Sequence, residues 1–156
     1  MGLLFCFSLL SLLLPFFALP ACAQGVYEAW VAGNFGDTPY ALAIDDSGNV
    51  YVTGISFGST TSYDYATIKY NSFGDTLWVR RYNGPGNAGD VAYALAVDDS
   101  GNVYVTGLSR NSGAVHDYDY TTIKYSSAGD TLWIRRYNSP GNHSDKAEAL
   151  AVDDSG

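Results

Sequence analysis

A short acidic segment that recurs along the chain is the first candidate for chemistry in this sequence. Asp-Asp-Ser-Gly-Asn occupies residues 45–49 and 98–102, and its first four residues return at 153–156. Alternating carboxylate and amide oxygens could bind calcium, but an EF-hand loop needs Gly at its sixth position and Glu at its twelfth. Here Gly48 is fourth and Ser56 is twelfth from Asp45. Asp, Gly and Asn favour tight turns, so we interpret these segments as turns, with calcium-stabilised adhesion as the alternative.

A glycine-rich segment at residues 84–89, Gly-Pro-Gly-Asn-Ala-Gly, formally matches the phosphate-binding pattern G-x-G-x-x-G. Such a loop must open a helix whose N-terminus faces the phosphate. An apolar strand-like run follows instead, and the sister segment at 139–144 reads Ser-Pro-Gly-Asn-His-Ser. We therefore interpret both segments as connections between sheets. Neither the G-x-S-x-G nor the H-E-x-x-H motif occurs, so the sequence predicts no catalytic residues.

The basic side chains give no clear site. Arg pairs stand at 80–81 and 135–136, and neighbours in a strand point to opposite faces. We expect one Arg of each pair to bond an Asp or Tyr of the next repeat. The two histidines, His116 and His143, lie in different loops. Two histidines so placed do not make a typical metal site, so the sequence predicts no metal and no cofactor.

The elements that must position these residues are repeats. Residues 41–54 recur at 94–107 with 13 of 14 positions identical, and residues 64–87 recur at 119–142 with 19 of 24 identical. A further copy opens at Ala149. Repeats of this period indicate a solenoid, a propeller or another array.

Each repeat reads as four short strands, which in the first copy are 40–45, 50–53, 65–70 and 76–82. Val, Ile, Thr, Tyr and Trp dominate these runs, and no segment shows a helical period. The first two strands are apolar or small on both faces, so we expect neighbouring sheets to cover them. The outer strands carry Lys69, Arg80 and Arg81, which favours a position nearer to solvent.

The first 23 residues have the pattern of an export signal. An apolar run at 3–17 is too short to span a bilayer and leads to Ala-Cys-Ala at 21–23, so we expect cleavage after Ala23. No Lys or Arg precedes the run, and Cys22 as a lipidation site is the alternative. Both cysteines, Cys6 and Cys22, lie in this leader. The expected mature chain then has no disulfide and no membrane span, and we expect it to be secreted, periplasmic or on the cell surface.

Composition limits the partners further. Sixteen acidic and eight basic residues give a net charge of −8, which disfavours nucleic acid and anionic membrane surfaces. Hydrophobic residues make up 47% of the chain and charged residues 15%, values that exclude a disordered tail.

The repeated motifs resemble a known family. Ala-Leu-Ala-Val-Asp-Asp-Ser-Gly-Asn-Val-Tyr-Val-Thr-Gly, Asp-Tyr-x-Thr-Ile-Lys-Tyr and Gly-Asp-Thr-Leu-Trp, over residues 40–156, are similar to the bacterial β-propeller repeats called SBBP. The resemblance implies an all-β fold of four-stranded antiparallel blades and an exported module, with no catalytic residues to carry over. At least four blades are needed to close a ring, so we expect an incomplete propeller of about two and a half blades. The expected parts are a signal peptide at 1–23, an orphan outer strand and link at 24–39, blades at 40–92 and 93–147, and the start of a truncated third blade at 148–156.

These observations favour a non-enzymatic binding or scaffolding module for an extracellular protein or glycan, as the N-terminal fragment of a longer protein. The alternative is a fragment of a secreted propeller enzyme (a lyase, glycosidase or quinoprotein) with catalytic groups elsewhere. Residues that differ between repeats are the better functional candidates, because repeated positions hold the sheets together. The candidates are Phe57, Tyr63, Arg110, His116 and His143.

Overall fold

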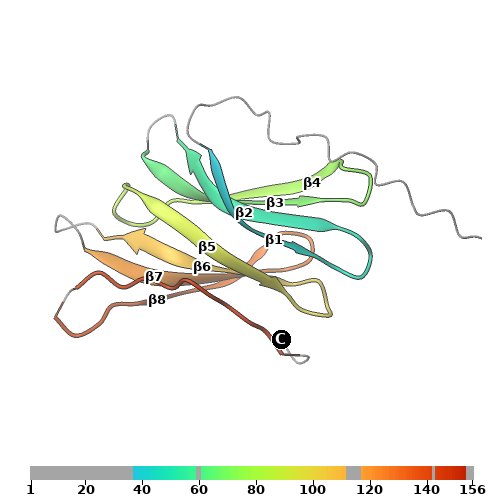
Figure 1. Ribbon diagram of the computed structural model, residues 1–156. Helices are drawn as coiled ribbons and strands as arrows, with labels where there is room; N and C mark the ends of the chain where they lie inside the picture. Colours follow the sequence, from blue (N-terminus) through green and yellow to red (C-terminus); the bar gives the residue numbers. More distant parts are fainter. Residues whose placement is uncertain (1–36, 59–60, 112–116, 142, 154–156) are drawn as a thin grey trace, which may run out of the picture. The chain divides into compact units, whose positions relative to one another are not determined.

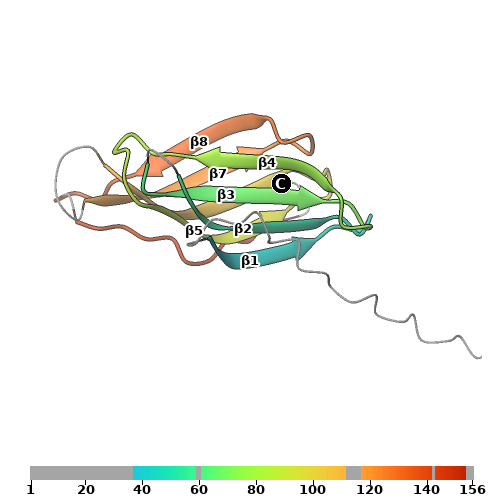
Figure 2. The ribbon, with the colours of Figure 1, turned by 90° about the horizontal axis from the view of Figure 1, so that it is seen from above.

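The computed structural model describes residues 37–58, 61–111, 117–141 and 143–153. Within them, eight strands form two antiparallel sheets of four strands each, with neighbours in the sheet also consecutive in the chain (Figure 1 and Figure 2). The first sheet contains β1 (Thr38–Ile44), β2 (Val50–Phe57), β3 (Tyr63–Tyr70) and β4 (Thr76–Tyr82). The second contains β5 (Asp90–Val97), β6 (Val103–Arg110), β7 (Tyr118–Tyr125) and β8 (Thr131–Tyr137). The predicted all-β class with four-stranded antiparallel sheets is confirmed.

Some of the predicted features lie outside the described residues. They are the leader at 1–23, the segment from 24 to 36, and His116. Residues 143–153, which begin the third repeat, are described and are not in a strand. Among the described residues, there is no helix with the length and apolar character needed to cross a membrane.

The second strand of each sheet is longer than its apolar run predicts. The sequence indicated a strand at 50–53, whereas β2 continues through Gly54 to Phe57. The continuation depends on Gly54, because a Cβ there would lie 2.1 Å from the carbonyl oxygen of Thr38 on β1. The pairing of β1 with β2 has a register shift at this point, between Pro39 and Ala41. The glycine thus allows a close backbone approach that a side chain would prevent.

The Asp-Asp-Ser-Gly-Asn segments are turns, as predicted. Asp45 accepts hydrogen bonds from the backbone N–H of Ser47 and Asn49, from the Asn49 side chain and from the Tyr51 hydroxyl, at 2.8–3.0 Å. Gly48 has a φ of 77°, a conformation that glycine adopts without strain. The first Asp of the segment therefore fixes the turn through its own carboxylate.

Asp98 repeats this arrangement in the second sheet. It accepts from the backbone and side chain of Asn102 at 2.8 Å and from the Tyr104 hydroxyl at 3.3 Å, and it pairs with Lys124 at 3.8 Å. Burial works to raise the pKa of the Asp98 carboxyl, but these hydrogen bonds and the Lys124 charge together lower it. The ionised carboxylate is the form that stabilises the turn.

The hydrophobic core lies between the two sheets. Strand alternation places Ala41, Ala43, Tyr51, Tyr65 and Trp78 on one face of the first sheet, and this face packs against the second. The second sheet contributes Ala92, Leu95, Val97, Val103, Val105, Ile123 and Tyr125. The Trp78 and Tyr125 rings lie 6.1 Å apart. Neither sheet could bury its apolar residues alone, so each depends on its neighbour.

Two expectations about exposure are wrong for the first sheet. Lys69 was expected near solvent but is 7% exposed, because β3 is an inner strand and the second sheet covers this face. β1 was expected to be covered on both sides, yet Leu42 and Ile44 are exposed while Ala41 and Ala43 pack into the core. The sequence shows which face of a strand is apolar but not which faces a neighbour covers.

We predict that Gly107→Ala destabilises the protein by at least about 2 kcal/mol, because overpacked positions cannot relax freely. A Cβ at Gly107 would lie 1.9 Å from the Val91 carbonyl oxygen and 2.9 Å from the Tyr65 hydroxyl. Urea denaturation measures the loss. The matched control is Gly89→Ala, where a Cβ meets nothing within 4 Å and the expected change is within about 0.5 kcal/mol. Equal effects of the two substitutions would contradict this account of the close strand approach.

We further predict that Asp98→Asn flattens the dependence of stability on pH in the acid range. The pKa of Asp98 is lowered from its ordinary value of 3.8, so its ionised form stabilises the fold above that pH. That contribution is lost as the pH falls through the lowered folded-state pKa. Urea titrations between about pH 6 and pH 2 should show a shallower decline for Asp98→Asn than for the parent. The control is Asp99→Asn, at an exposed neighbour, and should follow the parent. Parallel curves for Asp98→Asn and the parent would count against the role of this carboxylate.

Candidate binding surface

The loops that differ between repeats lie at one end of the two sheets. In an up-and-down meander, the β1–β2, β3–β4, β5–β6 and β7–β8 turns share one end, and the other connections share the opposite end. Figure 1 shows the β1–β2 and β5–β6 turns at the right and the β4–β5 connection at the left, where β2 ends and β3 begins. The right end carries the repeated turn sequences. We call the opposite end, with the β2–β3, β4–β5 and β6–β7 connections and residues 138–144, the variable end.

Phe57 and Tyr63 form an aromatic pair at the variable end. Phe57 ends β2 and Tyr63 begins β3, and the two are directly paired in the ladder. Their ring centroids lie 5.5 Å apart in an edge-on arrangement, and the side chains are 44% and 40% exposed. The structure thus brings together two of the predicted residues. Exposed aromatic rings of this kind supply contact area at low entropic cost.

Arg110 and His143 lie in other loops of the same end. Arg110 ends β6 and is half-buried, and its backbone is fixed on both sides: its N–H donates to Asp90, and its carbonyl accepts from the Gly86 N–H at 3.2 Å. His143 is exposed in the connection that follows β8. Four of the five predicted residues are therefore described, and all four lie at the variable end.

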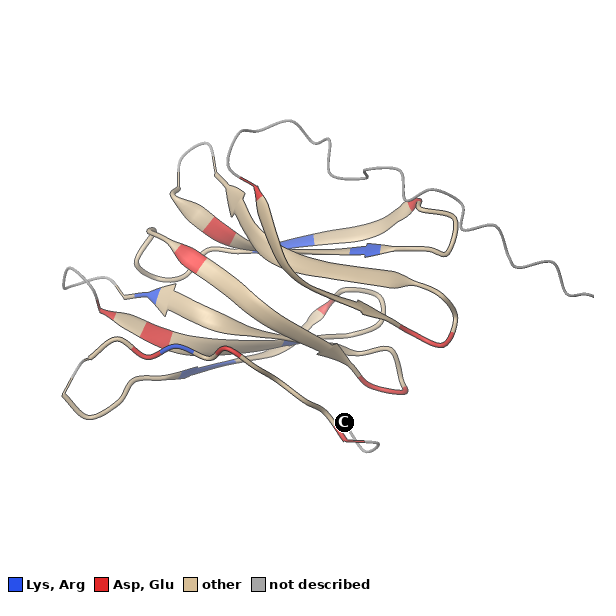
Figure 3. Ribbon diagram, in the orientation of Figure 1, with Lys and Arg blue, Asp and Glu red and all other residues tan. Residues whose placement is uncertain are grey.

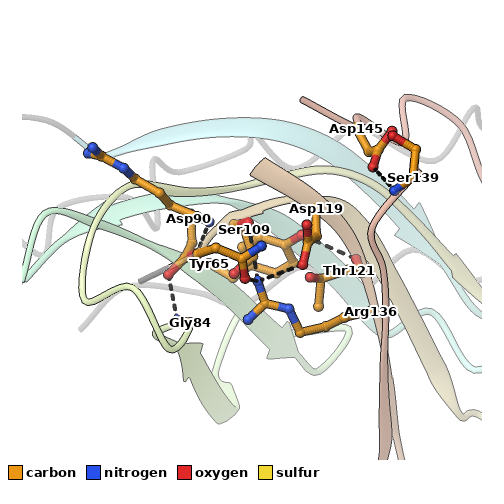
Figure 4. Close-up of polar contacts among 11 residues, drawn as sticks. Tyr65, Gly84, Asp90, Ser109, Asp119, Thr121, Arg136, Ser139 and Asp145 are labelled. Atoms are coloured by element: carbon orange, nitrogen blue, oxygen red, sulfur yellow. Dashed lines mark hydrogen bonds and ion pairs between the residues drawn. The ribbon is translucent and has the colours of Figure 1, made fainter. Parts of the chain in front are cut away.

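Asp90 is a residue of this end that the sequence interpretation missed. It is fully buried and accepts hydrogen bonds from the Gly84 N–H at 2.6 Å and the Arg110 N–H at 3.2 Å (Figure 4). Burial raises the pKa of its carboxyl, while the hydrogen bonds from the Gly84 and Arg110 N–H groups partly offset the shift. One carboxylate thus ties the β4–β5 connection to the end of β6.

The anchoring aspartate recurs in each repeat, and this is the sequence signal that could have identified it. Asp37, Asp90 and Asp145 each stand four residues before the Ala that opens the repeated Ala-Leu-Ala. Asp37 accepts from the Phe57 N–H at 3.0 Å, and Asp145 accepts from the Ser139 N–H at 2.7 Å. The repeat unit therefore begins at this aspartate, four residues before the Ala-Leu-Ala at which the most similar segment of the repeats starts.

A buried polar cluster supports the base of these loops (Figure 4). Arg136 bonds the Asn111 side chain at 2.8 Å and the Asp119 carboxylate at 3.3 Å, and so links β8 to the two ends of the β6–β7 loop. The Tyr65 hydroxyl donates to the Thr121 carbonyl at 3.2 Å, which joins the first sheet to the second. Burial, and next the Asp90 charge, raises the pKa of Tyr65, so its hydroxyl remains a donor.

The two arginines of the first pair contact different sheets. Arg81 bonds Ser56 at 2.7 Å and lies 3.9 Å from Asp64 in its own sheet. Arg80 donates from Nε to the Gly129 carbonyl of the second sheet. One Arg of the first pair does reach the next repeat, but its partner is a backbone carbonyl and not the expected Asp or Tyr.

The other end of the sheets contains a polar pocket. It has a volume of about 330 Å³ and lies between the 45–49 and 98–101 turns, with Lys69 and Ser127 in its wall. Figure 3 shows that acidic residues occupy these turns. Asp45 and Asp98 are already engaged by the hydrogen bonds that form the turns. Across the described parts of the chain, no three His, Cys, Asp or Glu side chains are grouped so that they could hold a metal ion.

The Gly-rich segment is a connection, as predicted. It joins β4 to β5, and a strand rather than a helix follows it. The Gly86 N–H bonds the Arg110 carbonyl, and Asn87 has a positive φ of 46°. This geometry packs the segment against the end of β6 and leaves no helix N-terminus to receive a phosphate.

The comparison with known protein families supports the repeat that the sequence shows. No curated protein matches the chain. Residues 77–113, which run from β4 through β5 and β6, match the family model described as SBBP, beta-propeller repeat. The two sheets are open in the described residues, as expected of an incomplete propeller. The match over residues 77–113 is to the same repeat family that the sequence resembles.

Proposed function

We propose that this chain is a non-enzymatic, exported binding module that contacts an extracellular protein or glycan through its variable end. The observation that supports the proposal most is that the two ends of the sheets differ in how similar the repeats are to each other. The β1–β2 and β5–β6 turns, which are identical between repeats, lie at one end, and the β2–β3 and β6–β7 loops, which differ in length and sequence, lie at the other. Variable loops on a rigid scaffold are the usual location of binding residues.

Hydrogen bonds from residues at the base of the variable end hold its loops in place. Asp90 fixes Gly84 and Arg110, and Arg136 fixes the ends of the β6–β7 loop. A loop whose base is fixed in this way loses less conformational entropy when it binds a partner. Such support favours binding over a purely structural role for these loops.

The chemistry of the surface fits a polar ligand with apolar faces. Phe57 and Tyr63 offer exposed rings, and Arg110 offers hydrogen-bond donors in the next sheet. Sugar rings and peptide side chains both stack on aromatic residues and accept hydrogen bonds from arginine. The net charge of −8 disfavours a nucleic acid.

Export is the second part of the proposal and is supported by sequence. The apolar run at 3–17 and Ala-Cys-Ala at 21–23 favour cleavage after Ala23, with lipidation of Cys22 as the alternative. The absence of cysteine after residue 22 means that packing and strand pairing alone hold the exported protein together.

We predict that the purified protein binds members of an array of immobilised polysaccharides and extracellular proteins, and that Phe57→Ala weakens the strongest interaction at least tenfold. Truncation of a central aromatic residue costs about 2 kcal/mol, which corresponds to about thirtyfold in affinity. Biolayer interferometry against the captured ligand measures the change.

The matched control is Phe73→Ala. Phe73 is 90% exposed but lies in the β3–β4 turn at the opposite end, so its removal should leave the affinity unchanged. The proposal would be wrong if the array showed no saturable binding. It would also be wrong if Phe73→Ala weakened binding as much as Phe57→Ala.

A further inference from the structure

The contact between β1 and β5 contains a pair of tyrosines that the proposed binding role does not use. The ring centroids of Tyr40 on β1 and Tyr93 on β5 lie 5.3 Å apart, with the ring planes inclined by 58°. Tyr40 is 48% exposed and Tyr93 is half-buried, so solvent reaches the pair. Because β1 belongs to the first sheet and β5 to the second, the pair spans the boundary between the sheets.

Each of these tyrosines is the extra residue of a β-bulge. The register between β1 and β2 shifts at Tyr40, which is left out of the pairing. The register between β5 and β6 shifts in the same way at Tyr93. A bulge re-aims a side chain that regular alternation would place elsewhere. Two equivalent bulges therefore direct the two rings to the same contact between the sheets.

The third repeat does not continue this arrangement. Glu148 stands directly before the third Ala-Leu-Ala, where Tyr40 and Tyr93 stand before the first and second copies. Lys146 pairs with Glu148 at 2.8 Å and lies over the Tyr93 ring, 4.1 Å from its centroid. Its ammonium group covers one face of that ring, which limits the approach of a second molecule. The tyrosine pair is thus a feature of one contact in this chain and not of every repeat.

Other tyrosine pairs among the described residues differ from this one. The Tyr65 and Tyr82 rings lie 5.5 Å apart, but Tyr65 is only 1% exposed. Tyr120 and Tyr137 are exposed on the open face of the second sheet, turned away from the first, and their rings are stacked with an angle of 21°. Both of these pairs join neighbouring strands of a single sheet.

Neighbouring phenols can be joined through their rings by a one-electron oxidant, such as a peroxidase with hydrogen peroxide. Each phenol gives up one electron and its O–H proton, and the two radicals form a bond between their Cε carbons, next to the hydroxyls. Each of these carbons then passes its hydrogen, as a proton, to the oxygen of its own ring, which restores both phenols. The two electrons and two protons that leave reduce one hydrogen peroxide to two waters. Because the new bond lies in the plane of both rings, stacked rings must first separate, whereas tilted rings need only a small rotation.

We propose that Tyr40 and Tyr93 form an oxidative cross-linking site, at which a dityrosine bond joins the first sheet to the second. The chain has no cysteine after Cys22, so a covalent link between the sheets needs side chains other than thiols. The fold already holds the rings together, which favours coupling within one chain over coupling between chains. The two residues are 53 positions apart in the sequence, so the bond would restrict the unfolded chain as a disulfide of that span does.

The test treats the purified protein, at low concentration, with a plant peroxidase and hydrogen peroxide. We expect a product that stays monomeric in denaturing electrophoresis, has the blue fluorescence of dityrosine and has lost two hydrogen atoms by mass. After trypsin digestion, the peptide that ends at Lys69 should be joined to the peptide 82–110. The melting temperature of the product should exceed that of the untreated protein by at least about 5 °C.

Conservative variants identify the site. Tyr40→Phe and Tyr93→Phe each keep the ring but remove the O–H that must be oxidised, so either should lower the yield of the monomeric product at least about tenfold. The matched control is Tyr120→Phe, which removes a hydroxyl from the exposed stacked pair. It should leave the yield unchanged.

Three results would overturn the proposal. One is the lack of a monomeric dityrosine product under conditions that couple free tyrosine. Another is a product that persists in Tyr40→Phe or is removed by Tyr120→Phe. The third is dityrosine found only in linked dimers, which would assign the reaction to encounters between chains.

Discussion

The structure depends on the contact between the row Tyr51, Lys69 and Trp78 of the first sheet and the β7–β8 turn of the second. A four-stranded meander of this size has too little core to be stable alone, and burial against a neighbour supplies what it lacks. The row combines aromatic burial with hydrogen bonds to backbone carbonyls. Each such bond is worth about 1 kcal/mol net, but leaving a buried donor unpaired would cost more, so the contact selects one arrangement of the sheets.

This dependence explains the distribution of conserved and variable sequence between the repeats. The Asp turns, the Lys-Trp row and the anchoring aspartates recur because each repeat must both cover its predecessor and be covered by its successor. The ends of β2 and β6 and the connections beyond them carry no such requirement. They differ between repeats, with Phe57 at the end of β2 and Arg110 at the matching position of β6, so one end of the sheets can vary without loss of the interface.

Much of the fold follows from the sequence, and the exceptions have physical causes. Strand-forming runs and turn residues were sufficient to predict eight strands and the meander, and Thr76–Tyr82 was placed to the residue. The burial of Lys69 could not be predicted, because alternation along a strand does not say which face a neighbour covers. Asp90 was missed because its partners are backbone N–H groups of distant segments, and only the recurrence of an aspartate four residues before each Ala-Leu-Ala points to it. Phe57 stands where the repeats differ, with Arg110 at the matching position of β6, whereas Tyr63 is matched by Tyr118; a role of these residues in binding stays a prediction.

The most direct test of this account is the exchange of the tryptophan indole protons with solvent, measured by nuclear magnetic resonance. The Trp78 indole N–H is buried and bonded to the Ser127 carbonyl, whereas Trp133 lies on the open face. Sub-global opening controls exchange at buried sites, so the Trp78 proton should exchange at least about 100-fold more slowly than that of Trp133. Equal, rapid exchange of both protons would show that the two sheets do not hold each other through this row.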